Sequence, residues 1–234
     1  MSDRFDTLLL DLGNTRLHWQ WGEQVGAMDA DATATADLPA GTPGAIAWSA
    51  VGDAESLRPL QQRYADVPWL RCERPDARLL PTRYDPERLG IDRWLGALAG
   101  ARLSADCIVI SAGTALTLDI VHDGEHLGGW IMPGYRLWQS ALYGGTRIPR
   151  APDAPLTDRP GLSTGDAIGN GWLVAATGAV QVAAQQLPGR PPLLLAGGDA
   201  ELLATAVPEA IHQPNLVLQG LSIWAGRQQD RGAL

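Results

Sequence analysis

The stretch that decides the fold is LLLDLGNTRLHWQW, Leu8–Trp21. It opens with a continuous apolar run that ends on Asp11, and after Gly13 and Asn14 apolar and polar residues alternate. A continuous apolar run predicts a fully buried strand, and alternation predicts a strand with one exposed face. Glycine and asparagine favour tight turns. The stretch therefore predicts a β-hairpin with a carboxylate at the end of its buried strand.

The same pattern returns 100 residues later in IVISAGTALTLD, Ile108–Asp119, where Gly113 aligns with Gly13 and Thr114 with Asn14. Around the two hairpins, the periodicity predicts a strand at 45–51 and a strand with a glycine turn at 193–198. It predicts helices near 53–65, 89–103, 135–143, 163–187 and 221–227. Such a repeat is typical of two similar α/β lobes. Two apolar hairpins can also look alike by chance, and the repeat alone does not decide between these interpretations.

Charge and composition exclude several classes of function. The chain of 234 residues has a formal net charge of −8, which argues against a nucleic-acid backbone as the main partner. All 18 basic residues are arginine, since the sequence contains no lysine. This excludes a Walker-type phosphate loop and Schiff-base chemistry. A phosphate site in this chain must use backbone amides, hydroxyls, arginine and a metal ion.

Targeting, disulfide and structural metal signals are weak. No apolar run approaches the roughly 20 residues that span a bilayer, and the first residues are too polar for a signal peptide. We therefore expect a cytoplasmic protein with no membrane partner. The cysteines, Cys72 and Cys107, form no CxxC motif, and His122 and His126 flank a DGE turn that favours a hairpin over a metal site. The tryptophans, Trp130 among them, are interpreted as core residues.

The glycine turns suggest a phosphate site. Free backbone N–H groups in such a turn can cradle phosphate oxygens, although GNT can also serve only to make a tight turn. The second interpretation does not explain Asp11 at the strand end. A carboxylate there can hold Mg²⁺ against a triphosphate, directly or through water. With the turn at Gly113 and the one after LLLAGG (193–198), the residues indicate an ATP site without lysine.

Five motifs occur in one order: DLGNT (11–15), GIDR (90–93), SAGTALTLD (111–119), GGWIMPG (128–134) and LSTGDAI (162–168). This series resembles that of the type III pantothenate kinases, a family within the superfamily of sugar kinases, acetate kinase and actin. The resemblance implies an α/β fold of two ribonuclease-H-like (actin-like ATPase) lobes with the active site in the cleft between them. We place the lobes at 1–106 and 107–234. It also implies ATP-dependent phosphorylation of the terminal hydroxyl of pantothenate, the first step towards coenzyme A.

The resemblance also assigns ATP-binding residues. The first phosphate loop comprises Asp11, Leu12, Gly13, Asn14, Thr15, Arg16, Leu17 and His18, with Asp11 near the Mg²⁺ bound with ATP. Gly113 and Thr114 match the second phosphate loop. Glycines of GGWIMPG are expected where backbone segments approach closely. The family usually has an aspartate two residues before the second-loop glycine, which helps to bind K⁺ or NH₄⁺. Here that residue is Ser111, so dependence on a monovalent cation is left open.

The pantothenate-binding motif maps to Gly90, Ile91, Asp92 and Arg93. Asp92 is assigned as the general base, since an attacking alcohol needs a carboxylate within reach of its proton. Arg93 can pair with the pantothenate carboxylate. Without the family pattern, an aspartate in the first turn of a helix is the preferred interpretation of Asp92.

Two further substrate contacts follow from the resemblance. A family tyrosine is carried over to Tyr84, although Arg83 stands three residues before Pro86, where the family has its tyrosine. Thr164 matches a threonine that reaches pantothenate across a homodimer interface, and it can also be the N-cap of its helix. Two alternatives remain: a kinase or phosphatase acting on another small hydroxylated compound, and a non-catalytic regulator of the same fold. Pantothenate-stimulated ATP turnover separates a pantothenate kinase from the first alternative, and nucleotide binding without phosphate transfer would indicate the second.

Overall fold

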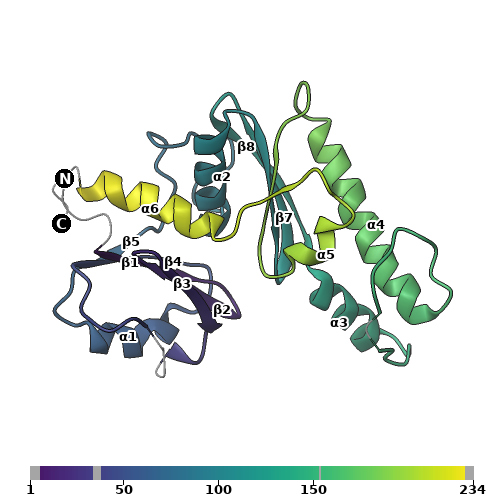
Figure 1. Cartoon of the computed structure of the whole chain (residues 1–234), viewed down its shortest axis with the longest axis horizontal. Coiled ribbons are helices and arrows are strands. Elements are labelled where there is room, and N and C mark those ends of the chain that lie inside the picture. The colour runs from purple at the N-terminus through teal and green to yellow at the C-terminus, as the bar shows by residue number, and fades with distance from the viewer. Residues whose placement is uncertain (1–5, 34–37, 153, 230–234) are drawn as a thin grey trace. The chain divides into compact units, whose positions relative to one another are not determined.

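Two five-stranded sheets organise the chain, one in each of two structural units (Figure 1). The computed structural model describes residues 6–33, 38–152 and 154–229. The first unit comprises the described residues up to Arg102 together with the C-terminal helix α6 (Leu216–Gln229). The second unit is the intervening segment, Leu103–Pro214.

The first sheet has the order β3-β2-β1-β4-β5. Its strands are β1 (Thr7–Leu12), β2 (Arg16–Trp21), β3 (Gln24–Asp29), β4 (Ala45–Ala50) and β5 (Trp69–Arg71). β1, β2 and β3 run antiparallel to one another in sequence order, whereas β4 lies parallel to β1 and β5 parallel to β4. β1 is central, and every one of its residues is buried, which explains its continuous apolar run.

Alternation along β1 separates two faces of this sheet. Leu8, Leu10 and Leu12 are fully buried in one core cluster, to which η2 (Ala54–Leu57) and α1 (Arg58–Arg63) contribute Leu57 and Leu60. Asp11 lies on the opposite face. That side of the unit holds α6, which packs on β1, β2 and β4.

Helices α2 (Ile91–Leu103) and α6 contact each other closely. A Cβ atom on Gly220 of α6 would lie 2.0 Å from the carbonyl oxygen of Leu95 in α2. Only glycine allows this approach, because any side chain would overlap the backbone of the neighbouring helix. The crossing therefore fixes α2, and with it the GIDR motif at its start, to the helix that covers β1.

The second sheet repeats the topology of the first, in the order β10-β9-β6-β7-β8. Its strands are β6 (Cys107–Ala112), β7 (Ala115–His122), β8 (Glu125–Pro133), β9 (Leu193–Ala196) and β10 (Ile211–His212). β6, β7 and β8 are antiparallel in sequence order, and β9 and β10 add in parallel beside β6. Strand for strand, this is the arrangement of β1 to β5. The duplication suggested by the two hairpins is confirmed.

The described residues of the second unit form three helices: α3 (Tyr135–Gly145), α4 (Thr164–Ala184) and α5 (Ala200–Ala204). α4 places Trp172, Leu173 and Ala176 in the core cluster of the second sheet. By length and composition, it is the one helix among the described residues that could cross a membrane, and 44% of its apolar window is buried inside the protein. Its hydropathy is therefore accounted for in part by core packing.

The structure differs from the sequence-based expectations at several points. Residues 216–229 pack on the first sheet, although the lobe boundary at 106 placed them in the second lobe. Strands β3, β5 and β10 were not predicted, because they are short or alternate weakly. Trp130 is 40% exposed on β8, which corrects its assignment to the core. The turn between β7 and β8 is confirmed, with Asp123 and Gly124 both at positive φ, as type I′ hairpins require.

Candidate active site

The first predicted phosphate loop leaves β1 at Leu12 and enters β2 at Arg16. The Gly13 amide donates to the Arg16 carbonyl over 2.8 Å, which closes a tight turn with Asn14 and Thr15 exposed at its tip. Leu12 and Leu17 are fully buried in the core. Their side chains therefore hold the hairpin in place, and only their backbone groups are available to a ligand.

A glycine that the sequence analysis did not single out supports this loop. Gly52 follows β4, and a Cβ atom there would lie 2.3 Å from the Gly13 carbonyl oxygen. The amides of Val51 and Gly52 donate to the Leu12 carbonyl over 3.0 and 3.2 Å. The end of β4 therefore sets the position of the loop backbone. The sequence signal was present, a glycine directly after a buried strand, as at Gly13 and Gly113.

Asp11 is a buried carboxyl group, 8% exposed, on the α6-covered face of the sheet. The Ser49 hydroxyl donates to its Oδ1 over 2.8 Å. Burial raises the pKa of Asp11 to about 7, the Ser49 hydrogen bond counteracts this in part, and the charge of Asp92 raises it further. His18 stands directly opposite Asp11 on β2. Burial is the main cause that lowers the pKa of His18, and the positive charge of Arg16 lowers it further.

The surroundings of Asp11 fit a divalent cation. The described residues include no cationic side chain that forms an ion pair with this carboxylate, while a second carboxylate lies near enough to act on it electrostatically. A buried negative charge of this kind is costly unless it is neutralised. Carboxylate oxygen is also the preferred protein ligand of Mg²⁺. The donor set is therefore one that a magnesium ion would stabilise.

Asp92 lies in the first turn of α2, as the structural interpretation of GIDR expected. Its Oδ1 accepts the Arg93 amide over 2.9 Å, and a Cβ atom on Gly90 would lie 2.7 Å from the same oxygen. Gly90 therefore leaves room for the carboxylate at the start of the helix. Ile91 is buried, so its side chain serves packing. The negative charge of Asp92 contributes to the raised pKa of Asp11, so the two carboxyl groups are coupled electrostatically within the first unit.

Arg93 and Tyr84 form a second pair beside Asp92. The guanidinium carbon of Arg93, which is only 8% exposed as a residue, lies 5.4 Å from the centre of the half-buried Tyr84 ring. The indole N–H of Trp94 donates to the Leu80 carbonyl over 3.1 Å, which attaches the preceding segment to α2. Arg83 is exposed. Tyr84, one of the two residues considered for the family tyrosine's role, thus lies beside Arg93.

The second predicted phosphate loop joins β6 to β7 and repeats the first in detail. The Gly113 amide donates to the Ala115 carbonyl over 3.0 Å, and Thr114 is exposed. The Gly134 amide donates to the Thr114 carbonyl, and a Cβ atom on Gly134 would lie 1.9 Å from the Gly113 carbonyl oxygen. The close approach predicted for GGWIMPG is confirmed here. Ser111 is half-buried on β6, at the position that corresponds to Asp11.

The third glycine turn completes the likeness between the units. Gly197 follows β9 with φ +99°, and a Cβ atom there would lie 2.1 Å from the Ala112 carbonyl oxygen. The same carbonyl accepts the Asp199 amide over 3.0 Å. Gly197 therefore packs behind the second loop as Gly52 packs behind the first. In each unit the strand added in parallel to the central one is followed within two residues by a glycine that supports the hairpin turn.

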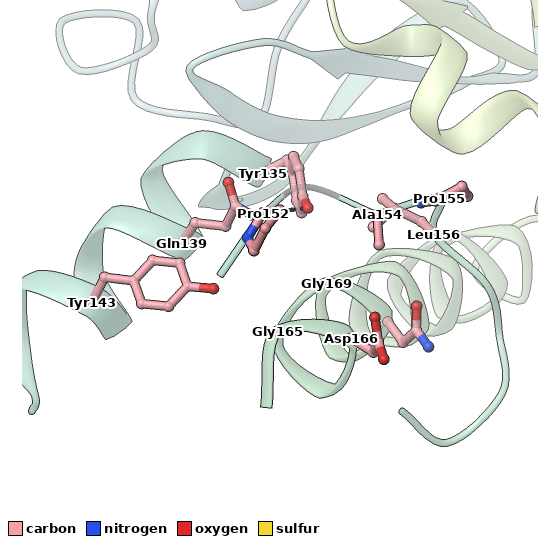
Figure 2. Close-up of a pocket in the computed structure, with 11 residues that line it drawn as sticks. Tyr135, Gln139, Tyr143, Pro152, Ala154, Pro155, Leu156, Gly165, Asp166 and Gly169 are labelled. Atoms are coloured by element: carbon pink, nitrogen blue, oxygen red, sulfur yellow. Dashed lines mark hydrogen bonds between the residues drawn. The ribbon is translucent and has the colours of Figure 1, made fainter. Parts of the chain in front are cut away.

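Thr164 is exposed in the first turn of α4, but it is not the N-cap. Ser163 caps the helix: its hydroxyl accepts the Asp166 amide over 3.1 Å and lies 2.8 Å from Asp166 Oδ2. The hydroxyl of Thr164 is therefore not needed for capping. Figure 2 shows a pocket at this end of α4, where Gly165 and Asp166 lie across from Gln139 and Tyr143 of α3.

The duplicated sheets and their paired glycine loops define a class. A five-stranded sheet of order 3-2-1-4-5, repeated once in the chain, is the core of the two-lobed actin-like ATPase fold. Solved structures agree with this class. The activator of 2-hydroxyisocaproyl-CoA dehydratase from Clostridium difficile, with bound ADPNP, superimposes with a TM-score of 0.51 at 10% identity, covering 97% of this chain and 96% of that one.

Sequence comparisons identify the family within this class. A family model described as type III pantothenate kinase matches residues 7–186. The type III pantothenate kinase of Pseudoalteromonas translucida is 36% identical over 232 residues, 93% of this chain and 95% of the relative. That of Halorhodospira halophila is 36% identical over 255 residues, 96% and 99% of the two chains. The chain belongs to the type III pantothenate kinase family.

One further solved structure supports the fold. A protein from Campylobacter jejuni, described as a Baf family transcriptional activator, superimposes with a TM-score of 0.68 at 23% identity, covering 97% of this chain and all of that one. At this identity the likeness concerns the fold alone.

Proposed function

We propose that the chain transfers the γ-phosphate of ATP to the terminal hydroxyl of pantothenate, which gives 4′-phosphopantothenate, the first step of coenzyme A biosynthesis. Membership of the type III pantothenate kinase family supports this reaction. The observation that carries it is the group of Asp11, Asp92, Arg93 and Tyr84 in one unit, a candidate metal-binding carboxyl group with a candidate base and a candidate substrate anchor. The chain is proposed to work in the cytoplasm, with no nucleic-acid or membrane partner.

Asp92 is the proposed base. Its carboxylate takes the proton of the attacking hydroxyl, while the Arg93 guanidinium, held against Tyr84, pairs with the pantothenate carboxylate and orients the alcohol. Since the Gly13 amide is used within its hairpin, other backbone N–H groups of the first loop are proposed to bind phosphate oxygens of ATP, and the resemblance assigns the same role to the second loop. Asp11 would hold Mg²⁺, which supplies neutralisation of charge on the phosphates. Most of the rate enhancement then comes from positioning.

A coupled assay of ADP release tests this function. ATP turnover should depend on both pantothenate and magnesium, and mass spectrometry should find phosphorylated pantothenate. A kinase of another substrate would turn over ATP with a sugar or other small alcohol and not with pantothenate. A regulator of the same fold would bind nucleotide without any transfer.

Ser111 bears on the proposed monovalent-cation site. A hydroxyl is a weaker ligand for K⁺ or NH₄⁺ than a carboxylate, and its neutrality also leaves less negative charge beside the phosphates. We expect Ser111→Asp to increase the stimulation of turnover by K⁺ at least about threefold relative to Na⁺, because it adds a charged oxygen ligand. Titration of both proteins with KCl at constant ionic strength measures this. Equal responses would contradict the proposed role of position 111.

A homodimer is also proposed, with Thr164 near the interface. One face of α4 exposes apolar and small residues. Val174 is 51% and Val182 is 49% exposed, and a Cβ atom on Gly171 or Gly178 would meet nothing within 4 Å. Such a face allows close approach of a second helix. Thr164 lies at the start of this same helix.

The α4 face predicts a specific loss of assembly. Light scattering should give twice the 24.9 kDa mass of the chain, and Val174→Arg should yield monomer because it places a charge within an apolar contact. Val25→Arg is the matched control, since Val25 is 50% exposed on β3 of the other unit. If the Val174 variant remained a dimer, this face of α4 would be excluded as the dimer interface.

A further inference from the structure

Ser49 occupies a special position beside Asp11. It lies near the end of β4, is fully buried, and pairs with Asp11 in the parallel ladder between β1 and β4. Its hydroxyl donates to Asp11 Oδ1 over 2.8 Å. The neighbouring residues Trp48 and Ala50 belong to or pack against the core on the other face of the sheet. Ser49 is thus the residue through which β4 contacts the carboxyl group at the end of β1.

We propose that Ser49 is a positioning residue that holds the Asp11 carboxylate in the orientation needed for the magnesium ion bound with ATP. This inference rests on the proposed use of magnesium and ATP. A serine hydroxyl has one proton to donate, and here it is directed at one carboxylate oxygen. The other oxygen, Oδ2, is left for the metal ion or its bound water. A buried carboxylate without this bond could rotate about its side-chain torsions, and part of the binding energy would be spent on ordering it.

The geometry gives this hydrogen bond its rigidity. Both side chains are carried by adjacent, paired strands of the sheet, so neither has to be ordered by a flexible loop. The residues that follow β4 support the loop at Gly13 through the close approach of Gly52 to the Gly13 carbonyl. β4 therefore positions two parts of the first phosphate site together, the metal-facing carboxylate through Ser49 and the glycine turn through Gly52.

Ser49→Ala tests the proposal by direct binding. Calorimetry of ATP in the presence of magnesium should show an affinity lowered about tenfold, the scale of a hydrogen bond to a charged group. The affinity for ATP in the presence of EDTA should be unchanged. Ser49→Cys has a side chain of similar size with a weak donor, so its affinity for ATP with magnesium should lie between those of the wild type and Ser49→Ala. In turnover, the apparent KM for magnesium and ATP should rise more than kcat falls.

Thr33→Ala is the matched control. Thr33 is 3% exposed in the same unit, and its hydroxyl bonds the Ser56 carbonyl instead of a carboxylate. This variant should lose thermal stability as Ser49→Ala does, yet bind ATP with magnesium normally. Wild-type magnesium-dependent affinity in Ser49→Ala, or equal loss in both variants, would overturn the inference. Because binding is measured without pantothenate, failure of the kinase assay and failure of this inference are distinguishable.

Discussion

Asp92→Asn should lower turnover of ATP and pantothenate about 10³-fold, within the range typical of a lost general base. The amide keeps the size of the side chain, and its oxygen can still accept the Arg93 amide at the start of α2. The helix should therefore form as before, but the side chain can no longer take a proton. Steady-state kinetics would show the loss in kcat, while calorimetry would show nearly unchanged affinity for ATP.

A matched control for Asp92→Asn is Asp85→Asn. Asp85 is an exposed carboxylate of the preceding segment, where it accepts the Glu87 amide over 3.0 Å and lies 3.5 Å from Arg88. It carries the same charge as Asp92 without any assigned role in transfer. The control should keep more than half of the wild-type rate. Near-normal turnover in the Asp92 variant would remove the base assignment.

Asp11→Asn should reduce turnover about 10²-fold and nearly abolish the response to magnesium, because an amide oxygen is a much weaker ligand for Mg²⁺ than a carboxylate. The hydrogen bond from Ser49 can still be made to the amide oxygen, so the sheet should be undisturbed. A magnesium titration of turnover measures the effect. An unchanged magnesium response would exclude Asp11 from metal binding.

Asp11→Asn should stabilise the folded protein although it lowers the activity. The pKa of Asp11 is raised from 3.8 to about 7 in the folded protein, chiefly by burial. Between about pH 4 and pH 7 the unfolded chain has therefore released this proton while the folded one retains it, so the free energy of unfolding falls as pH rises. The full penalty, about 4 kcal/mol, is present above pH 7.

Asp11→Asn should remove this penalty. Without magnesium, the melting temperature of the wild type relative to the variant should fall between pH 5 and pH 8. A variant that is more stable and less active at pH 8 would show that the carboxylate is kept for function at the expense of the fold. If the melting temperatures of the two proteins changed with pH in the same way across this range, the raised pKa of Asp11 would be contradicted.

Much of the fold follows from local patterns. The hairpin after Leu8 and its repetition after Ile108 were visible because burial on both faces gives a continuous apolar strand, and a turn needs glycine. The start of α2 at GIDR and the turn at Asp123 also followed from residues close together in the sequence. These features depend on neighbours along the chain, which the sequence displays directly.

The contacts that support the candidate site depend on strand order instead. In AIAWSAV, Ser49 looks like an ordinary strand residue, and only the parallel pairing of β4 with β1 puts it beside Asp11. Gly52 could be noticed as a glycine after a strand, but its contact with the Gly13 carbonyl likewise depends on this pairing. Likewise, the sequence of a short apolar helix does not indicate which sheet the helix packs on, so the packing of α6 on the first sheet was not predicted.

The return of α6 to the first unit has a consequence for synthesis on the ribosome. The second unit is one uninterrupted segment, so all of its residues are synthesised before those of α6. The first unit is split, and the face of β1 that carries Asp11 lacks α6 until residues 216–229 have been made. The unit that is begun first is thus completed after the second one. A chain truncated after residue 214 would lack α6, so the apolar surface that α6 covers in the first unit would be exposed to chaperones and proteases.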